Sequence, residues 1–236
     1  MELRDSIALV TGAGRGIGHA IAVALAREGA HVGLMGLSAG HLQAVEKEIG
    51  PLGTRCVVLP GDVSDEGSVS RCVAFAEQKL GPIDILVNNA GVYAHGPVDK
   101  LDALVFDHTI AVNLRGPFLM ARAVLPGMKS RRRGHIVNIA STAGRRGFAG
   151  GAAYCASKFG LAGLSEAMLH DVRGHDVRVT CILPSTVATD MSRRGDFLKN
   201  PEKAMRPDDV AQAVVAVLRL DARVLATTLE LWQTNP

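Results

Sequence analysis

A tyrosine and a lysine four residues apart, Tyr154 and Lys158, are the side chains of this chain best suited to proton transfer. Residues 152–172 have a helical pattern, so both side chains should lie on one face of a helix. An ordinary phenol has a pKa of about 10, and a nearby ammonium favours the phenolate and makes proton exchange feasible. Taken alone, however, a Tyr-x-x-x-Lys spacing is more often a surface contact than a catalytic pair.

Two other polar residues stand where the expected structure changes. The β-branched, apolar strand at residues 135–140 ends at Ser141, whose hydroxyl can hydrogen-bond an oxygen of a substrate. Residues 101–130 have a helical pattern that is interrupted near residues 113–117, where a glycine and a proline favour a break or kink. Asn113 lies at this break, and its amide could bond freed backbone groups or a bound water.

The first expected strand, at residues 7–10, is followed by a glycine-rich turn, TGAGRGIG, at residues 11–18 and then by a helix. Glycines let the turn bend sharply and approach a ligand closely, and the free N–H groups at the start of a helix favour a phosphate. The turn therefore predicts a site for the pyrophosphate of a dinucleotide. Its expected contacts are Gly12, Arg15, Gly16, Ile17 and Gly18.

The second expected strand is not followed by an acid. In NAD-binding sheets an acid at this place usually binds the ribose 2′-hydroxyl, but residues 31–41 contain none. Gly36 and Leu37 occupy the position instead, and Arg15 with Ser38 could hold a 2′-phosphate. NADP(H) is therefore the favoured cofactor. NAD(H) stays open as the alternative, because Arg15 could be a solvated turn residue and Leu37 supplies no second cation.

Two further expected strands also end in polar or small residues. The strand at residues 55–59 leads to Asp62, which could accept a hydrogen bond from an adenine amino group or cap the loop. The strand at residues 82–87 leads into Asn-Asn-Ala-Gly, a sequence suited to a tight turn beside a flat ligand. These strand ends add five residues to the expected dinucleotide contacts: Asp62, Val63, Asn89, Ala90 and Gly91.

Strands and helices alternate along the whole chain. The expected strands lie at residues 7–10, 31–35, 55–59, 82–87, 135–140, 177–183 and 226–233. Ser64 is the expected N-cap of a helix at residues 65–80. The alternation predicts an α/β fold of the Rossmann type, with a doubly wound parallel seven-stranded sheet covered on both faces. Ligands bind beyond the carboxyl ends of such strands, where the polar candidates converge, and this favours the catalytic interpretation of Tyr154 and Lys158.

The bulk composition is that of an ordinary globular protein, with 47% hydrophobic and 21% charged residues, which excludes a disordered or fibrous chain. One domain spanning 1–236 is the simplest organisation, with a polar substrate-loop region at about 184–206. A net charge of +3 without long basic runs gives no indication of nucleic-acid binding. No leader pattern or apolar run of about eighteen residues occurs, so we expect a soluble, cytoplasmic protein without membrane contact. The cysteines and histidines form no ligand pattern, so we expect reduced thiols and no metal site.

Four motifs together make the chain similar to the short-chain dehydrogenase/reductase family from end to end. They are TGAGRGIG at residues 11–18, NNAG at residues 88–91, Asn113, and Ser141 with Tyr154 and Lys158, in the family's order and approximate spacing. The resemblance implies hydride transfer between a nicotinamide cofactor and a carbonyl or alcohol. In that scheme Tyr154 passes the proton and Ser141 holds the substrate oxygen. Lys158 lowers the pKa of Tyr154 and bonds the nicotinamide ribose, while Asn113 holds a water linked to Lys158.

Within the family, the chain is most similar in general to 3-oxoacyl-carrier-protein reductases, which implies an NADPH-preferring reductase of a ketone or 3-oxoacyl substrate. Arginines at residues 131–133, with Arg145 and Arg146 beside the substrate mouth, could receive an acidic acyl-carrier thioester, although such charges are usually only solvated. The alternative is a non-catalytic dinucleotide-binding sensor or scaffold of the same fold, which the intact catalytic set argues against. The family also implies a homotetramer or homodimer built through the helices at residues 101–130 and 152–172.

One segment departs from the family pattern. After the sixth strand, Leu-Pro-Ser at residues 183–185 replaces the usual Asn-Pro-Gly, and the serine should make the backbone less permissive. Val187 and Thr189 still resemble the family's contacts to the nicotinamide amide, so we expect a changed loop geometry that retains these contacts and that of Pro184. The substrate pocket should be lined by residues 93–97, by residues 142–151 and by the loop after Pro184.

Overall fold

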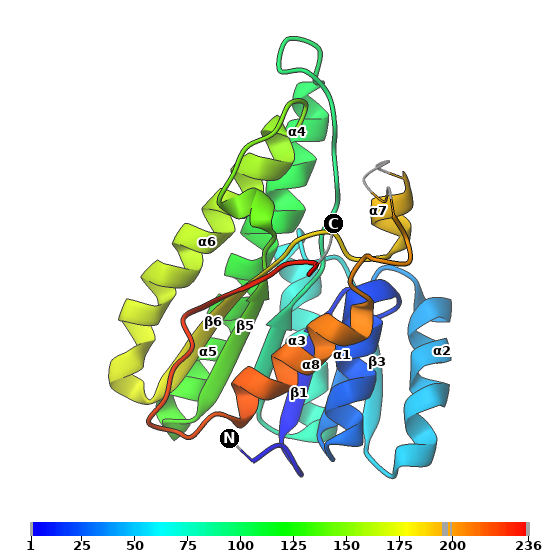
Figure 1. The fold of residues 1–236 in the computed structure, drawn as a ribbon. Helices are drawn as coiled ribbons and strands as arrows, with labels where there is room; N and C mark the ends of the chain where they lie inside the picture. Colours follow the sequence, from blue (N-terminus) through cyan, green and yellow to red (C-terminus); the bar gives the residue numbers. More distant parts are fainter. Residues whose placement is uncertain (1, 195–197, 199, 235–236) are drawn as a thin grey trace.

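The structure is a computed structural model that describes residues 2–194, 198 and 200–234. Seven strands form one parallel sheet in the order β3-β2-β1-β4-β5-β6-β7, with helices on both faces (Figure 1). The strands are β1 (Ile7–Thr11), β2 (His31–Gly36), β3 (Cys56–Pro60), β4 (Ile85–Asn88), β5 (Gly134–Ile139), β6 (Val177–Pro184) and β7 (Thr228–Leu231). The strand order reverses between β1 and β4, which pair directly. The expected doubly wound, seven-stranded sheet is confirmed.

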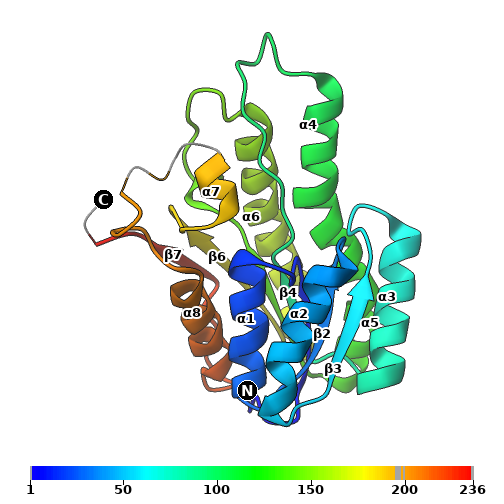
Figure 2. The ribbon, with the colours of Figure 1, turned by 90° about the vertical axis from the view of Figure 1, so that its right-hand side faces the viewer.

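Two sets of helices cover this sheet. One face carries α2 (Ala39–Ile49), α1 (Gly16–Arg27) and α8 (Pro207–Arg219), which lie side by side in Figure 2. The other face carries α3 (Glu66–Leu80), α5 (Gly116–Arg131) and α6 (Ala152–Val172), and α4 (Ala103–Ile110) packs against α6. The short helix α7 (Asp190–Arg194) stands at the edge where the strands end. Both faces of the sheet are thus removed from water, which explains the nearly continuous apolar strands.

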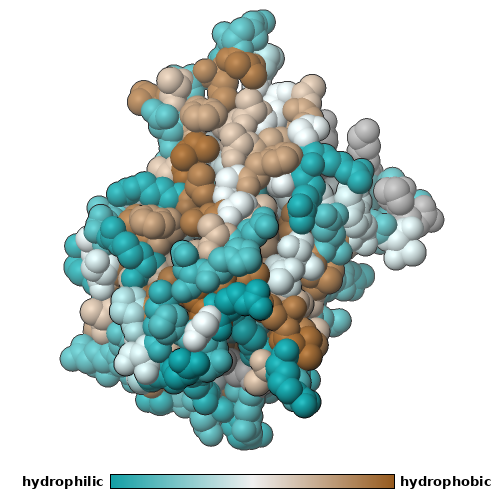
Figure 3. All heavy atoms as spheres, turned by 90° about the vertical axis from the view of Figure 1, so that its left-hand side faces the viewer, coloured by the Kyte–Doolittle hydropathy of each residue, from teal (hydrophilic) through white to brown (hydrophobic). Residues whose placement is uncertain are grey.

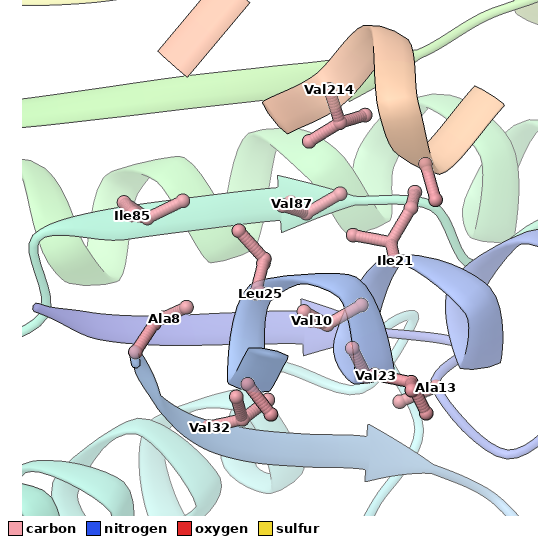
Figure 4. Close-up of a cluster of buried hydrophobic side chains, with 14 of the residues drawn as sticks. Ala8, Val10, Ala13, Ile21, Val23, Leu25, Val32, Ile85, Val87 and Val214 are labelled. Atoms are coloured by element: carbon pink, nitrogen blue, oxygen red, sulfur yellow. The ribbon is translucent and has the colours of Figure 1, made fainter. Parts of the chain in front are cut away.

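The central strand β1 supplies side chains to both cores. Ala8 and Val10 belong to the cluster beneath α1, where Ile21 and Leu25 face them (Figure 4). Leu9, between them in the sequence, belongs to the cluster beneath α3 and α5. All five side chains are fully buried, as the alternation of side chains along a strand covered on both faces requires. The glycine turn that follows β1 is therefore anchored by a fully buried strand.

The start of α3 differs from the expectation. The sequence places Ser64 at the N-cap, but Asp65 holds that position, and its carboxylate accepts from the backbone N–H of Ser68. Ser64 instead donates its hydroxyl to Oδ1 of Asp62 at 2.7 Å. An aspartate caps a helix as well as a serine does, and its charge is also stabilised by the helix dipole, which accounts for the shift by one residue.

The interruption expected near residues 113–117, as a break or a kink, takes the form of a π-helical turn rather than a break. α4 continues through a π-helical turn, Ala111–Arg115, directly into α5. Pro117 lies in the first turn of α5, where the wider π turn before it accommodates a residue without an N–H. The π turn carries Asn113, whose side chain is fully buried. Turns of this kind are frequent at functional sites.

A buried histidine, His135, lies on β5 and makes the fold sensitive to acid. Its Nε2 lies 2.8 Å from Oγ1 of Thr180, which itself donates to the carbonyl of Ala226 at 2.7 Å. Thr180 must therefore accept from the ring, so Nε2 carries the proton of a neutral imidazole. The other ring nitrogen, Nδ1, is buried without a hydrogen-bond partner. Burial, followed by the charge of Arg178, lowers the pKa of His135 to about 3.

We expect His135 alone to reduce the free energy of unfolding by about 2 kcal/mol between about pH 6.5 and pH 4.5. Its pKa is lower in the folded chain, so only the unfolded chain takes up the proton as the pH falls below about 6.5, and stability is lost on the acid side. Urea unfolding at a series of pH values should show a shallower loss for His135→Gln than for the parent. The exposed His170→Gln is the matched control, and parallel parent and His135→Gln curves would contradict the assignment.

Two features are absent from the described part of the chain. No helix there is both long and apolar enough to cross a membrane. No three His, Cys, Asp or Glu side chains within that part come together as a candidate metal site. The four cysteines are free thiols, and three of them are buried. The structure therefore provides no disulfide that would hold the fold together, which depends on its two cores.

Candidate active site

A cavity of about 1080 Å³ runs along the carboxyl ends of the strands, across the point where β1 and β4 meet. In doubly wound sheets this reversal of strand order is where ligands bind. Tyr154 and Lys158 line one end of the cavity, and the residues that follow β2 line the other. The residues expected from the sequence that line it are Gly12, Arg15, Gly16, Ile17, Ser38, Asp62, Val63, Asn89, Ala90, Gly91, Tyr154, Lys158 and Thr189.

The glycine turn between β1 and α1 is shaped to accept a phosphate. Gly12 and Gly16 have φ angles of 64° and 56°, in the left-handed region that favours glycine. A Cβ on Gly12 would lie 2.9 Å from the Cα of Ala90, so a larger residue would push two turns apart. α1 begins after Arg15 with no side-chain cap and no acidic residue in its first turn. Its first N–H groups can therefore bind an anion.

Three expected cofactor contacts lie behind the wall of the cavity. A Cβ on Gly18 would lie 2.2 Å from the carbonyl oxygen of Gly12, so this glycine is needed for packing α1 on the turn. Pro184 ends β6 and pairs with β7, and the buried Val187 forms a bridge with Met205. None of the three lines the cavity, because tertiary packing turns them inward. Their neighbours Ala188 and Thr189 do line it.

The Asn-Asn-Ala-Gly turn after β4 is fixed to the end of β1 by hydrogen bonds. Oγ1 of Thr11 accepts from the backbone N–H groups of Asn89 at 3.0 Å and Ala90 at 3.1 Å. The side-chain amide of Asn89 donates to the carbonyls of Thr11 at 3.0 Å and Gly12 at 3.4 Å. Asn89 therefore builds the floor of the cavity by joining two turns.

The end of the cavity beyond β2 contains no acid among the residues that follow this strand. Gly36, Leu37, Ser38 and His41 line it, and Leu37 is 78% exposed. Ser38 caps α2 by accepting from the N–H of His41 at 3.4 Å. Arg15 also lines the cavity, and its guanidinium lies 4.0 Å from the carboxylate of Asp190 across an exposed surface. Arginine and the start of a helix thus lie where the sequence favours a 2′-phosphate.

Asp62, which follows β3, fills one of the two roles that the sequence left open. Its Oδ1 accepts from the backbone N–H of Ser64 at 2.8 Å and from the Ser64 hydroxyl at 2.7 Å, so the carboxylate caps the turn. Asp62 and Val63 both line the cavity. The cap therefore holds the carboxylate at the cavity wall, where a bound base would lie.

Tyr154 and Lys158 lie one turn apart on α6, as the sequence predicts. Nζ of Lys158 lies 5.8 Å from the centre of the Tyr154 ring and donates to the carbonyl of Ile139 at 2.9 Å. Ser141 follows β5, begins the 3-10 helix Thr142–Gly144 and hydrogen-bonds the Tyr154 hydroxyl. Tyr154 and Lys158 line the cavity at this end, whereas Ser141 is not among the lining residues and joins them through its hydrogen bond to the Tyr154 hydroxyl.

Asn113 reaches this group through Ser157 and the backbone of Val92. Its Oδ1 accepts from the N–H of Val92 at 2.8 Å, and its Nδ2 donates to the Val92 carbonyl at 2.9 Å and to Oγ of Ser157 at 3.0 Å. Ser157 in turn donates to the carbonyl of Tyr154 at 2.7 Å. Of the roles left open by the sequence, the side chain of Asn113 fills the structural one, because it ties α6 to the turn after β4.

Burial dominates the protonation of the two reactive groups. It raises the pKa of Tyr154 to about 12, against a smaller lowering by the hydrogen bond from Ser141. It lowers the pKa of Lys158 to about 8, against a smaller raising effect of Cys181. Desolvation of the phenolate sets the direction of the shift in the protein alone, and the lowering of the Tyr154 pKa by Lys158 stays a prediction. The phenol is therefore protonated at neutral pH.

Residues 93–96, which follow β4, form the wall of the cavity beside Tyr154. The N–H of Gly96 donates to the carbonyl of Gly150 at 2.9 Å. The ring of Tyr93 meets that of Tyr154 edge to face at 5.1 Å and stacks with His95 at 6.3 Å. Both Tyr93 and His95 line the cavity. This part of the wall is aromatic, which suits a flat or apolar substrate.

Two lining residues, His41 and His108, were missed by sequence reasoning. Both lie within helical patterns that gave no indication of a ligand. Their positions in the sequence could have indicated that they line the cavity. His41 lies in the first turn of α2, beside the missing acid, and His108 precedes Asn113 by five residues on the same helix.

The residues present fit a nicotinamide dinucleotide. The glycine turn offers backbone N–H groups for the two phosphates. A Cβ on Gly91 would approach Oδ1 of Asn113 at 3.3 Å and Nζ of Lys158 at 3.8 Å, so glycine keeps this part of the cavity open. Lys158 donates one of its three N–H groups to the carbonyl of Ile139, which leaves two for ribose hydroxyls. Donors for phosphate and ribose thus lie along one cavity.

Comparisons with known proteins agree with this geometry. A family model described as short chain dehydrogenase matches residues 6–196. The chain is 37% identical over 234 residues to 2-(S)-hydroxypropyl-CoM dehydrogenase 3 of Xanthobacter autotrophicus, covering 92% of this chain and 91% of that protein. It is 39% identical over 228 residues to D-threitol dehydrogenase of Mycolicibacterium smegmatis, covering 91% and 86%. A match to a glycine betaine reductase of Emericella nidulans, 37% identical over 225 residues, covers 92% of this chain but 18% of that longer protein.

Solved structures with this fold are also similar in sequence. A levodione reductase superposes with a TM-score of 0.90 at 30% identity over 96% of each chain. A metagenomic short-chain oxidoreductase in complex with NADP superposes with a TM-score of 0.86 at 35% identity, over 98% of this chain and 99% of the other. The similarity in both sequence and fold thus extends over nearly the whole chain.

Proposed function

The chain belongs to the short-chain dehydrogenase family, and from that premise we propose that it is an NADPH-preferring reductase of small carbonyl compounds. Nicotinamide-dependent oxidoreduction is the chemistry of this family. The observation that carries the proposal is a cavity lined at one end by Tyr154, which Ser141 hydrogen-bonds, and by Lys158, and suited at its other end to a dinucleotide. The protonated phenol favours the direction of reduction, because it is ready to donate.

The chain's own residues handle the proton and the substrate oxygen. A bound nicotinamide cofactor supplies the hydride to the carbonyl carbon. Tyr154 donates its proton to the oxygen as negative charge develops there, and Ser141, already bonded to the phenol, holds the same oxygen. Lys158, with its pKa near 8, is mostly an ammonium at neutral pH and stabilises the phenolate that proton transfer leaves. In alcohol oxidation Tyr154 would accept the proton instead.

We propose NADP(H) as the preferred cofactor and NAD(H) as the weaker one. Arg15 and Ser38 would face the 2′-phosphate, and Leu37 stands where an acid would repel it. Asp62 would contact the adenine, and Lys158 the nicotinamide ribose. A solved relative that holds NADP supports the choice.

We propose a free ketone or diketone, rather than an acyl-carrier thioester, as the substrate. The arginines at residues 131–133 lie between α5 and β5, at the amino ends of the strands and opposite the cavity. Each has an acidic partner within the chain: Arg131 and Arg133 with Asp84, and Arg132 with Asp176. A carrier protein bound there could not deliver its thioester to Tyr154. The aromatic wall beside Tyr154 and the similarity to a levodione reductase support a compact ketone or diketone.

We further propose one domain over residues 1–236, in which residues 184–206 form the substrate-loop region, and a homodimer or homotetramer in the cytoplasm. Residues 195–197 and 199 of that region lie outside the described residues. Apolar side chains gather in patches on the face that carries α6 (Figure 3). Exposed large residues of α4, α5 and α6 include Leu104, Val105, Phe106, Phe118 and Phe159. Exposed patches of this kind mark interaction surfaces, and two copies paired through these helices would bury them.

A panel assay tests the proposed function. Purified protein is given NADPH or NADH together with simple ketones, diketones or an acetoacetyl thioester, and oxidation of the cofactor is followed by absorbance. We expect turnover of free ketones or diketones, with a higher kcat/KM for NADPH. Turnover confined to the thioester would assign the protein to fatty-acid-type reduction. Tight NADPH binding without turnover of any compound would support a non-catalytic sensor or scaffold.

A further inference from the structure

Residues 230–233, the last two residues of the C-terminal strand and the two that follow it, lie at the same edge of the sheet as the cavity. β7 is parallel to β6 and is the outermost strand, so its last residues stand beside the loops at the carboxyl ends of β5 and β6 (Figure 1). The loop after β5 carries Ser141, and the loop after β6 carries Thr189. One strand end is therefore placed to touch both loops.

Glu230 and Trp232 contact the loop that begins at Ser141. Nε of Arg145 lies 3.4 Å from Oε1 of Glu230, and the guanidinium of Arg146 lies 5.5 Å from the centre of the Trp232 ring. The backbone N–H groups of both arginines donate within the turn that Ser141 begins, so the side-chain contacts hold that turn directly. Trp232 is 52% exposed and belongs to none of the buried clusters, so its position is explained by its contact with Arg146 and by the hydrogen bond that its Nε1 donates to Oε2 of Glu230 at 3.3 Å.

Leu231 and Gln233 contact the other loop. The backbone N–H of Ser185 donates to the carbonyl of Leu231 at 2.8 Å, and its hydroxyl donates to Oε1 of Gln233 at 3.2 Å. Ser185 stands where the family usually has glycine, and Gln233 gives the added hydroxyl a partner. The loop then continues to Ala188 and Thr189 in the cavity wall.

We propose that residues 230–233 form a clamp that positions the Ser141 loop and the Ser185–Thr189 loop relative to each other across the substrate end of the cavity. Glu230 and Trp232 contact one loop, and Gln233, the next residue along the chain, contacts the other. Trp232 and Gln233 are positioning residues, which act through Arg146 and Ser185. The effect on the substrate rests on the proposed function, but the clamp itself can be tested without turnover.

Fluorescence tests the clamp directly, because Trp232 is the only tryptophan of the chain. NADP⁺, which does not absorb tryptophan emission, is titrated with selective tryptophan excitation. We expect the parent emission to change on binding, because the cofactor contacts the loop that Leu231 and Gln233 hold. Arg146→Ala should shift the starting emission and remove at least about half of the response, with the calorimetric Kd for NADP⁺ within about 2-fold of the parent. Arg132→Ala, an exposed arginine at the opposite edge, should behave like the parent.

Kinetics test the effect on the substrate. Trp232→Ala and Gln233→Ala should each raise KM for the ketone by about 3- to 10-fold, with a smaller change in kcat and no change in the Kd for NADPH. Trp232→Phe should recover most of the loss, because a phenyl ring still receives the guanidinium. Thr228→Val, exposed on the same strand, is the control.

Parent-like KM values in both alanine variants, or an unchanged fluorescence response in Arg146→Ala, would overturn the clamp. A parent without turnover would refute the proposed function and leave fluorescence to decide on the clamp.

Discussion

Tyr154→Phe should lower kcat/KM for carbonyl reduction by about 1000-fold while NADPH still binds with nearly the parent affinity. The substitution removes the hydroxyl whose raised pKa, about 12, keeps it protonated for donation. The phenyl ring keeps its edge-to-face contact with Tyr93 at 5.1 Å, so the shape of the cavity should persist. Steady-state kinetics measure the loss, and calorimetric titration with NADPH measures the retained binding. Thermal unfolding of both proteins confirms that the fold is unchanged.

Tyr93→Phe is the matched control, because the chain has two tyrosines and both line the substrate end of the cavity. It removes a phenol from the same wall without touching the pair formed by Tyr154 and Lys158. We expect it to lower kcat/KM by less than about 5-fold, since one hydrogen bond is the most it removes. Equal losses in the two variants would contradict proton donation by Tyr154. They would indicate that the two hydroxyls act only by shaping or hydrating the pocket.

Much of the fold and of the catalytic group could be predicted because both follow from local pattern. β1, β5 and β6 are short apolar runs bounded by turn residues, and they alternate with amphipathic helices, which leaves few arrangements other than a parallel sheet. Tyr154 and Lys158 are neighbours by helical geometry alone. Ser141 joins them because β5 ends there, at the edge where the glycine turn also lies.

What could not be predicted depends on contacts between segments far apart in the sequence. The glycine and proline near Asn113 predict a break or kink of the helix. The structure has a π turn there, in which the Asn113 side chain hydrogen-bonds Val92 and Ser157. The raised pKa of Tyr154 comes from burial, which no spacing reveals. The contact of Arg146 with Trp232 joins residues 86 positions apart. From the sequence, Arg146 could be a solvated surface charge, and Trp232 lies in an expected strand. Each of these features is decided by tertiary packing, which overrides local preference.

Leu37→Asp should weaken NADP(H) binding by about 100-fold and shift the preference to NAD(H). A carboxylate there would repel the 2′-phosphate beside Arg15 and Ser38, and it could accept the 2′-hydroxyl of NAD(H) instead. Leu37 is 78% exposed, so the change should leave the free energy of unfolding nearly unaltered and act on the ligand alone.

The neutral isostere Leu37→Asn separates charge from shape in this prediction. It has the size of the aspartate without its charge, so the Kd for NADPH should stay within about 3-fold of the parent value. Kd and kcat/KM for both cofactors, measured with all three proteins, decide between the explanations. Equal weakening by Asp and Asn would mean that Leu37 contributes apolar contact to the adenosine. An unchanged NADPH preference in Leu37→Asp would place the 2′-phosphate away from the end of β2, and the missing acid would then say nothing about the choice of cofactor.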